Sequence, residues 1–208
     1  MISKRSLLRR SAAAAVAASA ALVLAACGNG NDASAGHNGH TATSPSASAP
    51  ASQGQSYAAD VAFAKGMIPH HRQAIEMAGL APSRAQSAEV KKLAEDIKKA
   101  QDPEIKTLSG WLTSWGEQVP TEGETDHSAH GMAGMMSPQE MEKLKNSSGA
   151  AFDTAFMELM IKHHEGAVEM AKTERAQGVF PDAKTMADAI VTSQSTEIEQ
   201  MNKLLGRS

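Results

Sequence analysis

The sequence is poor in several residue types on which protein function commonly depends. It has one cysteine, Cys27, among 208 residues, and only 3% of its residues are aromatic. A single cysteine excludes an intrachain disulfide and a metal site built from several thiolates. The sequence also lacks a glycine-rich phosphate loop and the residue order of a catalytic triad. Nothing therefore indicates conventional catalysis, and histidine, methionine and carboxylates remain as the residues for chemistry.

The first 26 residues have the composition of an export signal. Four basic residues and no acid precede a run of Ala, Val, Leu and Ser from Ser11 to Ala26, which is too short for a stable membrane span. The run ends in Leu24-Ala25-Ala26-Cys27, which resembles a lipobox. We predict a signal peptide over 1–26 and a lipoprotein anchored to the outer face of the cell membrane by lipidated Cys27. Arg9-Arg10 leaves the choice between general and twin-arginine export open.

The charge of the exported chain limits its partners. Without residues 1–26 the chain has 16 basic and 23 acidic side chains, a net charge of −7. Such a surface repels nucleic-acid phosphates and attracts cations. We therefore exclude nucleic acid as a partner.

A segment of low complexity follows the leader. From Gly28 to about Gln55 the chain consists of Gly, Ser, Ala, Asn, Thr and Pro with almost no large apolar side chain. Such a composition cannot bury enough surface to offset the entropy of ordering. Residues 27–55 are predicted to be a disordered linker, and residues 56–208 to be the folded domain.

The folded domain contains one unit twice. Met67 to Ala78 and Met160 to Ala171 share the pattern Met-Ile-x-His-His-x-x-Ala-(Ile/Val)-Glu-Met-Ala at an offset of 93 residues. The same offset pairs Asp60 with Asp153 and Glu104 with Glu197. A constant offset over so many positions indicates duplication. We place repeat 1 at about 57–116, a His/Met-rich insert at 117–149 and repeat 2 at about 150–208.

Apolar residues at spacings of three and four predict helices in both repeats. The expected helices run from Ser56 to between Gly79 and Pro82, from Ser83 or Ser87 to about Gly116 with a kink at Pro103, from the capping box at Ser137 to about Lys145, from Ala150 to Gln177, and from Pro181 to Leu205. The second helix is expected to bury Val90, Leu93, Ile97, Ala100, Leu108 and Trp111. No strand pattern occurs. The prediction is an all-α four-helix bundle of two duplicated hairpins.

The paired histidines are the first candidate site. His70 and His71, and equally His163 and His164, border the apolar faces of their helices. Four buried imidazoles without partners would cost several kcal/mol. A shared metal ion would satisfy them, whereas hydrogen-bonded structural histidines are the alternative. We predict a metal site.

Methionine indicates which metal. Met67 precedes His70 by three residues, as Met160 precedes His163, where di-iron bundles have glutamate before histidine. A thioether in place of a carboxylate favours Cu(I) over iron or zinc. Met77 and Met170 are further candidate ligands, although methionine also fills irregular cores.

Carboxylates on the apolar stripes are the third candidates. Glu104 and Glu197 could ligate the metal or orient a ligand imidazole. Asp60 and Asp153 could act in the same way; the alternatives are that they cap helices or lie at a partly exposed end of the bundle. A second, weaker metal site is predicted in the insert, where small residues separate His127, His130, Met132, Met135 and Met136.

The duplicated motif resembles the domain of unknown function family numbered 305, over roughly residues 56–208. The resemblance implies a ferritin-like helical bundle and, for some members, copper binding and tolerance outside the cytoplasm. We expect copper sequestration by an exported lipoprotein. A ferritin-like cuprous or ferrous oxidase and a cell-surface interaction or sensor module are the alternatives. The sequence leaves protein partners and a homo-oligomer open.

Overall fold

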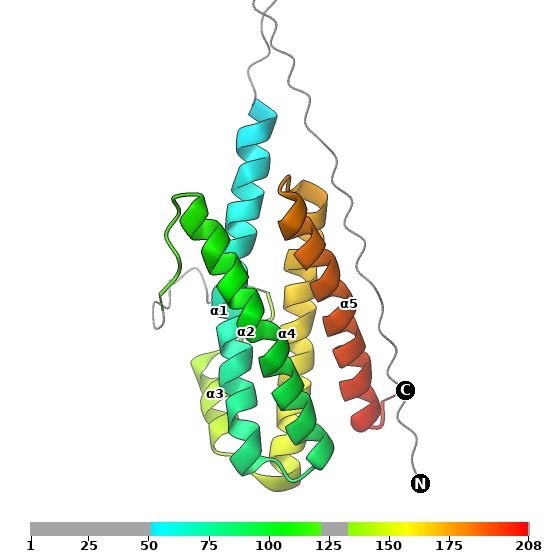
Figure 1. Ribbon diagram of the computed structural model, residues 1–208. Helices are drawn as coiled ribbons and strands as arrows, with labels where there is room; N and C mark the ends of the chain where they lie inside the picture. Colours follow the sequence, from blue (N-terminus) through cyan, green and yellow to red (C-terminus); the bar gives the residue numbers. More distant parts are fainter. Residues whose placement is uncertain (1–50, 122–132, 208) are drawn as a thin grey trace, which may run out of the picture. The chain divides into compact units, whose positions relative to one another are not determined.

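The structure, a computed structural model, describes the backbone of residues 51–121 and 133–207 and the side chains of residues 57–121 and 133–207. The predicted leader, Cys27 and most of the predicted linker lie outside these residues, as do His127, His130 and Met132. The described chain forms five helices, α1 Ala51–Arg84, α2 Ala88–Ser114, α3 Pro138–Lys145, α4 Gly149–Gln177 and α5 Pro181–Leu204 (Figure 1). The predicted all-α fold is confirmed. None of these helices combines the length and the apolar character needed to cross a membrane.

Helix α1 is longer than its sequence signals indicate. It begins at Ala51, before the expected start at Ser56, and continues past Gly79 and Pro82 to Arg84. Proline removes only one backbone hydrogen bond, and the apolar face continues through the fully buried Ala81, so the last turn remains helical. The capping box at Ser137 forms as predicted, with both reciprocal hydrogen bonds to Glu140.

Helix α2 buries a slightly different stripe from the predicted one. Ala100 is exposed, and its neighbour Gln101 is buried at 2% exposure. Trp111 is half-buried, and Leu112 takes the fully buried position beside it. The helix continues through Pro103. The residues that it buries therefore follow the period of one continuous helix and not of two separate segments.

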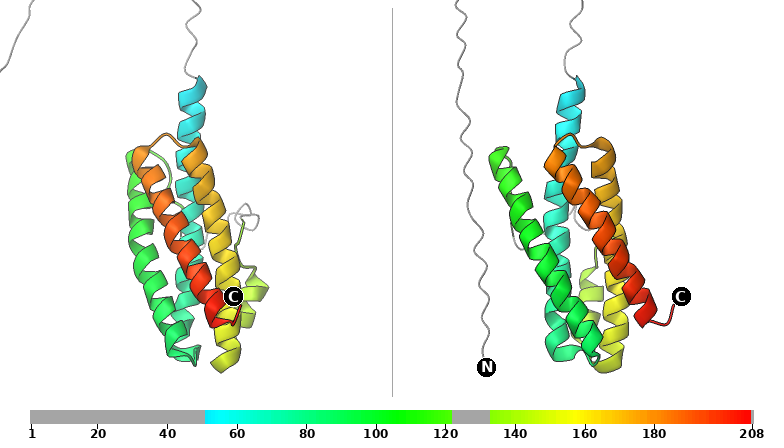
Figure 2. Two further views of the ribbon diagram at one scale, coloured as in Figure 1. Left: turned by 90° about the vertical axis from the view of Figure 1, so that its right-hand side faces the viewer. Right: turned by 45° about the vertical axis from the view of Figure 1, so that its right-hand side comes forward.

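The helices form two hairpins, α1–α2 and α4–α5, which pack against each other through α1 and α4. Helix α2 packs against α1, α5 against α4, and α1 against α4, while the short α3 lies beside α1 and α4 (Figure 2). Asp60, near the start of α1, bonds the backbone at the end of the α4–α5 connection, and Asp153, near the start of α4, bonds the α1–α2 connection. Helices α1 and α4 are therefore antiparallel.

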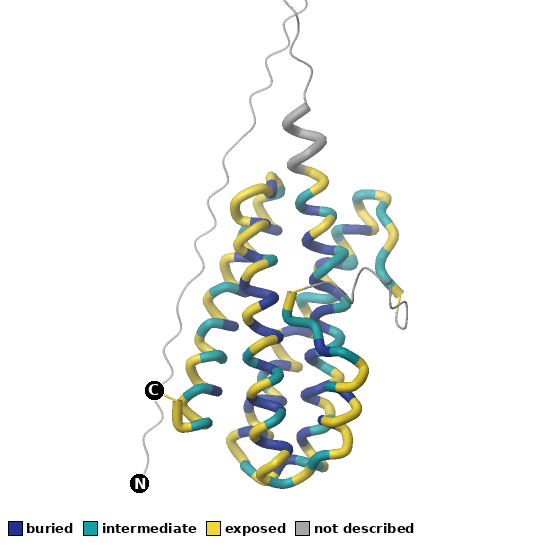
Figure 3. The backbone as a smooth tube through the Cα atoms, turned by 180° about the vertical axis from the view of Figure 1, so that it is seen from behind, coloured by how far each residue is buried: buried dark blue, intermediate teal, exposed yellow. Residues whose placement is uncertain are grey.

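The core consists of two apolar clusters separated by polar side chains. The Asp60-end cluster includes Phe63, Met67, Leu108, Leu112, Ala183 and Ile190, and the Asp153-end cluster includes Met77, Leu93, Ile97, Phe152, Phe156 and Met160. On each of the four long helices, the inward-facing residues between the two clusters are polar, and the buried positions among the described side chains lie on the inward-facing side (Figure 3). We call this set the polar layer: His70, His71, Gln101, Glu104, His163, His164, Gln194 and Glu197.

Candidate metal centre

The four histidines lie at the middle of the bundle. Each pair occupies consecutive positions on α1 or α4, so its two rings point about 100° apart around the helix axis. One ring of each pair faces the other repeat, and the other ring faces the second helix of its own repeat. All four histidines are 0% exposed. Each of the two helices therefore buries a face wide enough for two consecutive histidines.

The outer rings are held by the predicted glutamates. His71 Nε2 lies 2.7 Å from Glu104 Oε2, and the repeat reproduces this contact at 2.6 Å between His164 Nε2 and Glu197 Oε2. An ionised carboxylate only accepts, so Nε2 carries the proton and donates. This leaves Nδ1 as the ring's electron-pair donor, and Nδ1 of both histidines has no hydrogen-bond partner. The glutamates thus act as orienting acceptors of the kind found behind metal-bound histidines.

The inner rings meet each other. The centroids of His70 and His163 are 3.7 Å apart, with 43° between the ring planes. Burial and the neighbouring His71 lower the pKa of His70 to about 3, with the Ala133 backbone acting in the opposite direction. Burial and His70 lower the pKa of His163 well below its usual value. Both rings are neutral near pH 7 and have lone pairs available to a metal ion.

The donor atoms fit a soft or borderline metal ion. Six ring nitrogens of the four histidines are buried without a hydrogen-bond partner, an arrangement that costs free energy unless a ligand satisfies them. Within the described residues, no three His, Cys, Asp or Glu side chains form a ready-made cage. The planes of the two inner rings are tilted by 43° to each other. The centre therefore fits an ion of low coordination number held by imidazoles better than it fits a multi-carboxylate metal site.

Two buried glutamines belong to the same layer and were not among the predicted site residues. Gln101 and Gln194 are 2% and 3% exposed, and the Oε1 atom of each lacks a hydrogen-bond partner. Each lies one helical turn before the glutamate of its repeat. The signal that could have found them is the offset of 93, which pairs two glutamines on an otherwise apolar stripe.

The structure divides the predicted methionine ligands between the two sides of the polar layer. Met67 and Met170 pack in the Asp60-end cluster, whereas Met77 and Met160 pack in the Asp153-end cluster. Because α1 and α4 are antiparallel, equivalent residues of the repeats lie on opposite sides of the histidines. Thioethers therefore flank the layer on both sides, one from each repeat on each side.

Asp60 and Asp153 cap helices. Asp153 accepts from the backbone N–H of Gln86 at 3.1 Å and of Ser87 at 2.8 Å, directly before α2. Asp60 accepts from Val179 at 3.0 Å and Phe180 at 3.1 Å, directly before α5. Each repeat thus caps the second helix of the other, which is the capping alternative of the sequence analysis.

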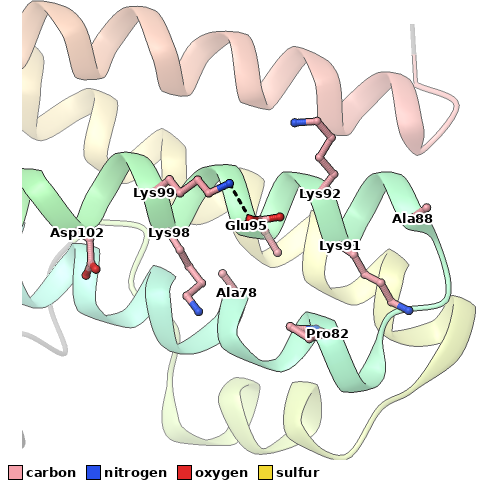
Figure 4. Close-up of a pocket in the computed structure, with 10 residues that line it drawn as sticks. Ala78, Pro82, Ala88, Lys91, Lys92, Glu95, Lys98, Lys99 and Asp102 are labelled. Carbon is pink, nitrogen blue, oxygen red and sulfur yellow. Dashed lines mark ion pairs between the residues drawn. The ribbon is translucent and has the colours of Figure 1, made fainter.

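The remaining candidates lie outside the layer. Met135 is half-buried and Met136 is 3% exposed, at the end of the insert before α3. A surface groove between α1 and α2 is lined by Ala78, Pro82 and several lysines, including the Lys99–Glu95 ion pair at 2.6 Å (Figure 4). The groove contains no histidine or methionine, so it is separate from the metal centre.

Known proteins resemble this chain over the whole described domain. A DUF305 protein from Streptomyces coelicolor that is regarded as secreted is 34% identical, with 71% of this chain and 92% of that chain covered and a TM-score of 0.64. A DUF305 fragment from Deinococcus radiodurans is 31% identical, with 72% and 97% covered and the same TM-score. CopM in its Cu(II)-bound form is 34% identical, with 70% and 94% covered and a TM-score of 0.60.

CopM has also been solved in Cu(I)-bound, Ag-bound and apo forms. Among curated proteins no sequence matches this chain. Residues 60–205 match the family described as "Domain of unknown function (DUF305)", which is most of the chain. The chain belongs to the DUF305 family.

Proposed function

We propose that this protein binds copper outside the cytoplasm and sequesters it in the polar layer, with Cu(I) preferred. The observation that carries the proposal is the set of six buried ring nitrogens without hydrogen-bond partners, contributed equally by both repeats. A bound ion would satisfy atoms that are otherwise costly to bury. The Cu- and Ag-bound forms of CopM support the same class of metal.

The ligands differ in their roles. The inner rings of His70 and His163 lie closest to each other and supply nitrogen donors from both repeats. His71 and His164 supply Nδ1, with Glu104 and Glu197 fixing the ring orientation. The four flanking methionines supply soft sulfur on either side. Imidazole suits several metals, but the thioethers favour Cu(I), and zinc gains little from them.

Chelator competition on the full chain tests this proposal. The wild-type protein should hold Cu(I) more tightly than Zn²⁺. The pair Met67→Leu with Met160→Leu should weaken Cu(I) while sparing Zn²⁺, because leucine keeps the volume and removes the sulfur. Unchanged Cu(I) affinity in this pair would assign these methionines to packing alone. Oxygen consumption by the Cu(I)-loaded protein would instead favour the oxidase alternative.

The location is part of the proposal and rests on a separate observation. The lipobox-like Leu24-Ala25-Ala26-Cys27 would place two or more acyl chains on the first mature residue, which is enough for stable anchoring. Cys27→Ala should release the protein from the membrane fraction, with Ser34→Ala as the matched control. Retention of the Cys27→Ala protein in the membrane would contradict the anchor without touching the copper proposal.

A further inference from the structure

Residues 133–137, the end of the insert, cross the outside of the polar layer; we call them the strap. Seen from behind, this part of the chain crosses in front of α1 and α4 before it enters α3 (Figure 3). Helices α2 and α5 supply the glutamates that bond the outer rings, so they cover a different side of the histidines. Among the described residues, the strap and α3 thus lie against α1 and α4 on the side that those helices leave open.

The strap rests on α4 through backbone contacts that require glycine. A Cβ atom on Gly166 would lie 2.0 Å from the Ala133 carbonyl oxygen and 2.5 Å from its carbon. A Cβ atom on Gly134, whose φ is +82°, would lie 2.7 Å from the Lys162 carbonyl oxygen and 2.9 Å from that of His163. No side chain can rotate to relieve such backbone contacts, and a positive φ itself favours glycine. The backbone of the strap therefore lies so close to the backbone of α4 that neither Gly134 nor Gly166 has room for a Cβ atom.

On α1 the strap is held by one side chain. Gln73 Nε2 donates to the Met136 carbonyl oxygen at 3.0 Å, and the Met136 N–H donates to Gln73 Oε1 at 2.7 Å. One amide thus satisfies both backbone groups of a residue that is 3% exposed. The strap is bound in both directions at Met136, and it continues directly into the capping box of α3.

The two attachment points are equivalent positions of the repeats. Gln73 follows His70 by three residues, and Gly166 follows His163 by three residues, so each lies one turn beyond an inner histidine. The duplicated motif differs at this position because the two residues do different tasks for one strap. Its Ala133 end lies against Gly166 of α4 and its Met136 end bonds Gln73 of α1, so the strap bridges the two helices that carry the inner histidines.

We infer that the strap closes the histidine centre against solvent and controls how fast an ion enters and leaves, with Gly166 and Gln73 as positioning residues. The part that concerns ions rests on the proposed copper binding, whereas the closure itself does not. Because the inner rings are fully buried, exchange requires an opening, and the strap is a short irregular segment with few attachments. Gly166 and Gln73 act on this rate through the position of the strap and not as ligands.

Gly166→Ala and Gln73→Ala in the full chain test the inference, with Gly110→Ala as the matched control, since a Cβ there meets nothing within 4 Å. The first readout is the rate at which diethyl pyrocarbonate modifies the peptides containing His70 and His163 in metal-free protein. The second is the rate of Ag(I) release to a chelator. Both strap variants should raise both rates by about tenfold or more while helicity is retained. The control should match wild type.

Wild-type modification rates in folded Gly166→Ala or Gln73→Ala protein would overturn the inference, as would an equal acceleration in Gly110→Ala. If Gly166→Ala fails to fold, Gln73→Ala decides the matter, because it removes two hydrogen bonds and adds no atom. Faster histidine modification in a protein that binds neither Cu(I) nor Ag(I) would retain the closure and reject the copper function. The two failures are therefore distinguishable.

Discussion

The two ends of the bundle differ in their buried carboxylates. At the end where α5 begins, Asp60 caps α5 and Glu174 lies beside Asp60. At the opposite end, Asp153 caps α2, and Ala81 occupies the position equivalent to Glu174. Glu174 is 1% exposed, and neither of its carboxylate oxygens has a hydrogen-bond partner of ordinary geometry. A Cβ atom on Gly178 would lie 2.1 Å from Glu174 Oε1 and 2.7 Å from Asp60 Oδ1. Glycine thus makes room for two carboxylates at one end only.

The carboxylate pair at this end of the bundle changes the pKa of Glu174. Burial and then the adjacent Asp60 raise the pKa of Glu174 to about 8, with Lys184 acting in the opposite direction. Glu174 is therefore protonated near pH 7. The polar layer shows no such asymmetry, since histidine, glutamine and glutamate recur in both repeats. The duplication is kept in the polar layer and in the capping aspartates, and it is lost at the position of Glu174 and Ala81.

The largest expected effect tests the symmetry of the layer. His70→Ala and His163→Ala should each lower Cu(I) affinity by about 100-fold or more, at or beyond the upper range for residues that only support a ligand. The two losses should be equal, because the rings meet at 3.7 Å from equivalent positions. Chelator competition measures both. A loss confined to one variant would show that a single repeat holds the ion.

The next largest effect is a loss of stability, which should differ between the two ends of the bundle that Asp153 and Asp60 cap. Asp153→Ala removes the acceptor of two backbone N–H groups, those of the exposed Gln86 and the half-buried Ser87, and should lower the free energy of unfolding by about 1 kcal/mol. Asp60→Ala should cost less, since it also removes the charge that opposes ionisation of Glu174. Urea denaturation near pH 8 compares them. Equal losses would mean that Glu174 contributes nothing to the difference.

The pH dependence of stability should come from the same end. The pKa of Glu174 is raised from 4.5 to about 8, so the folded chain holds a proton that the unfolded chain has released. Stability contributed by this proton is lost as pH rises toward 8, by up to about 1.4 kcal/mol per pH unit. Glu174→Gln should flatten the curve between pH 6.5 and 8. An unchanged slope in this variant would place the titration elsewhere.

The buried histidines change the folding stability in the opposite direction, at lower pH. The pKa of His70 falls from 6.5 to about 3 on folding, so the unfolded chain binds protons that the folded chain does not. Stability therefore decreases as pH drops below 6.5. Glu174→Gln is a control only below about pH 4.5, where the Glu174 carboxyl is protonated in both the folded and the unfolded chain.

The smallest expected effect again concerns equivalent residues. Glu104→Gln and Glu197→Gln should each lower Cu(I) affinity by about tenfold, because an amide oxygen still accepts from histidine Nε2 but without charge. Chelator competition with matched single variants measures the pair. A large loss from one glutamate and none from the other would contradict the equivalence of the two repeats at this layer.

Sequence periodicity predicted the features that depend on one helix or on the duplication. The helices, the inward histidines and the glutamates on the buried stripes all follow from spacings of three, four and 93. The roles of Asp60 and Asp153 did not follow, because they depend on how the repeats are oriented in space. Antiparallel packing of α1 on α4 takes each aspartate to a helix start more than sixty residues away along the chain.

The same orientation explains why the methionines are divided and why Glu174 was missed. Met67 and Met160 are equivalent in sequence, so they appeared to share one site, but the antiparallel arrangement places them on opposite sides. Glu174 has no partner at the offset of 93, and only the fold brings it to Asp60. The strap depends on contacts between the insert and α4 that no local pattern contains.

The exchange of helix caps also bears on how such a fold can arise. Each hairpin has an aspartate near the start of its first helix, and before its second helix it has backbone N–H groups that bond the aspartate of the other hairpin. A hairpin is therefore self-complementary: two identical copies, related by a twofold axis, would cap each other as the repeats do here. The present chain has the arrangement of such a symmetric dimer fused into one polypeptide, with the histidine layer on the former axis and the strap built from the fusion segment.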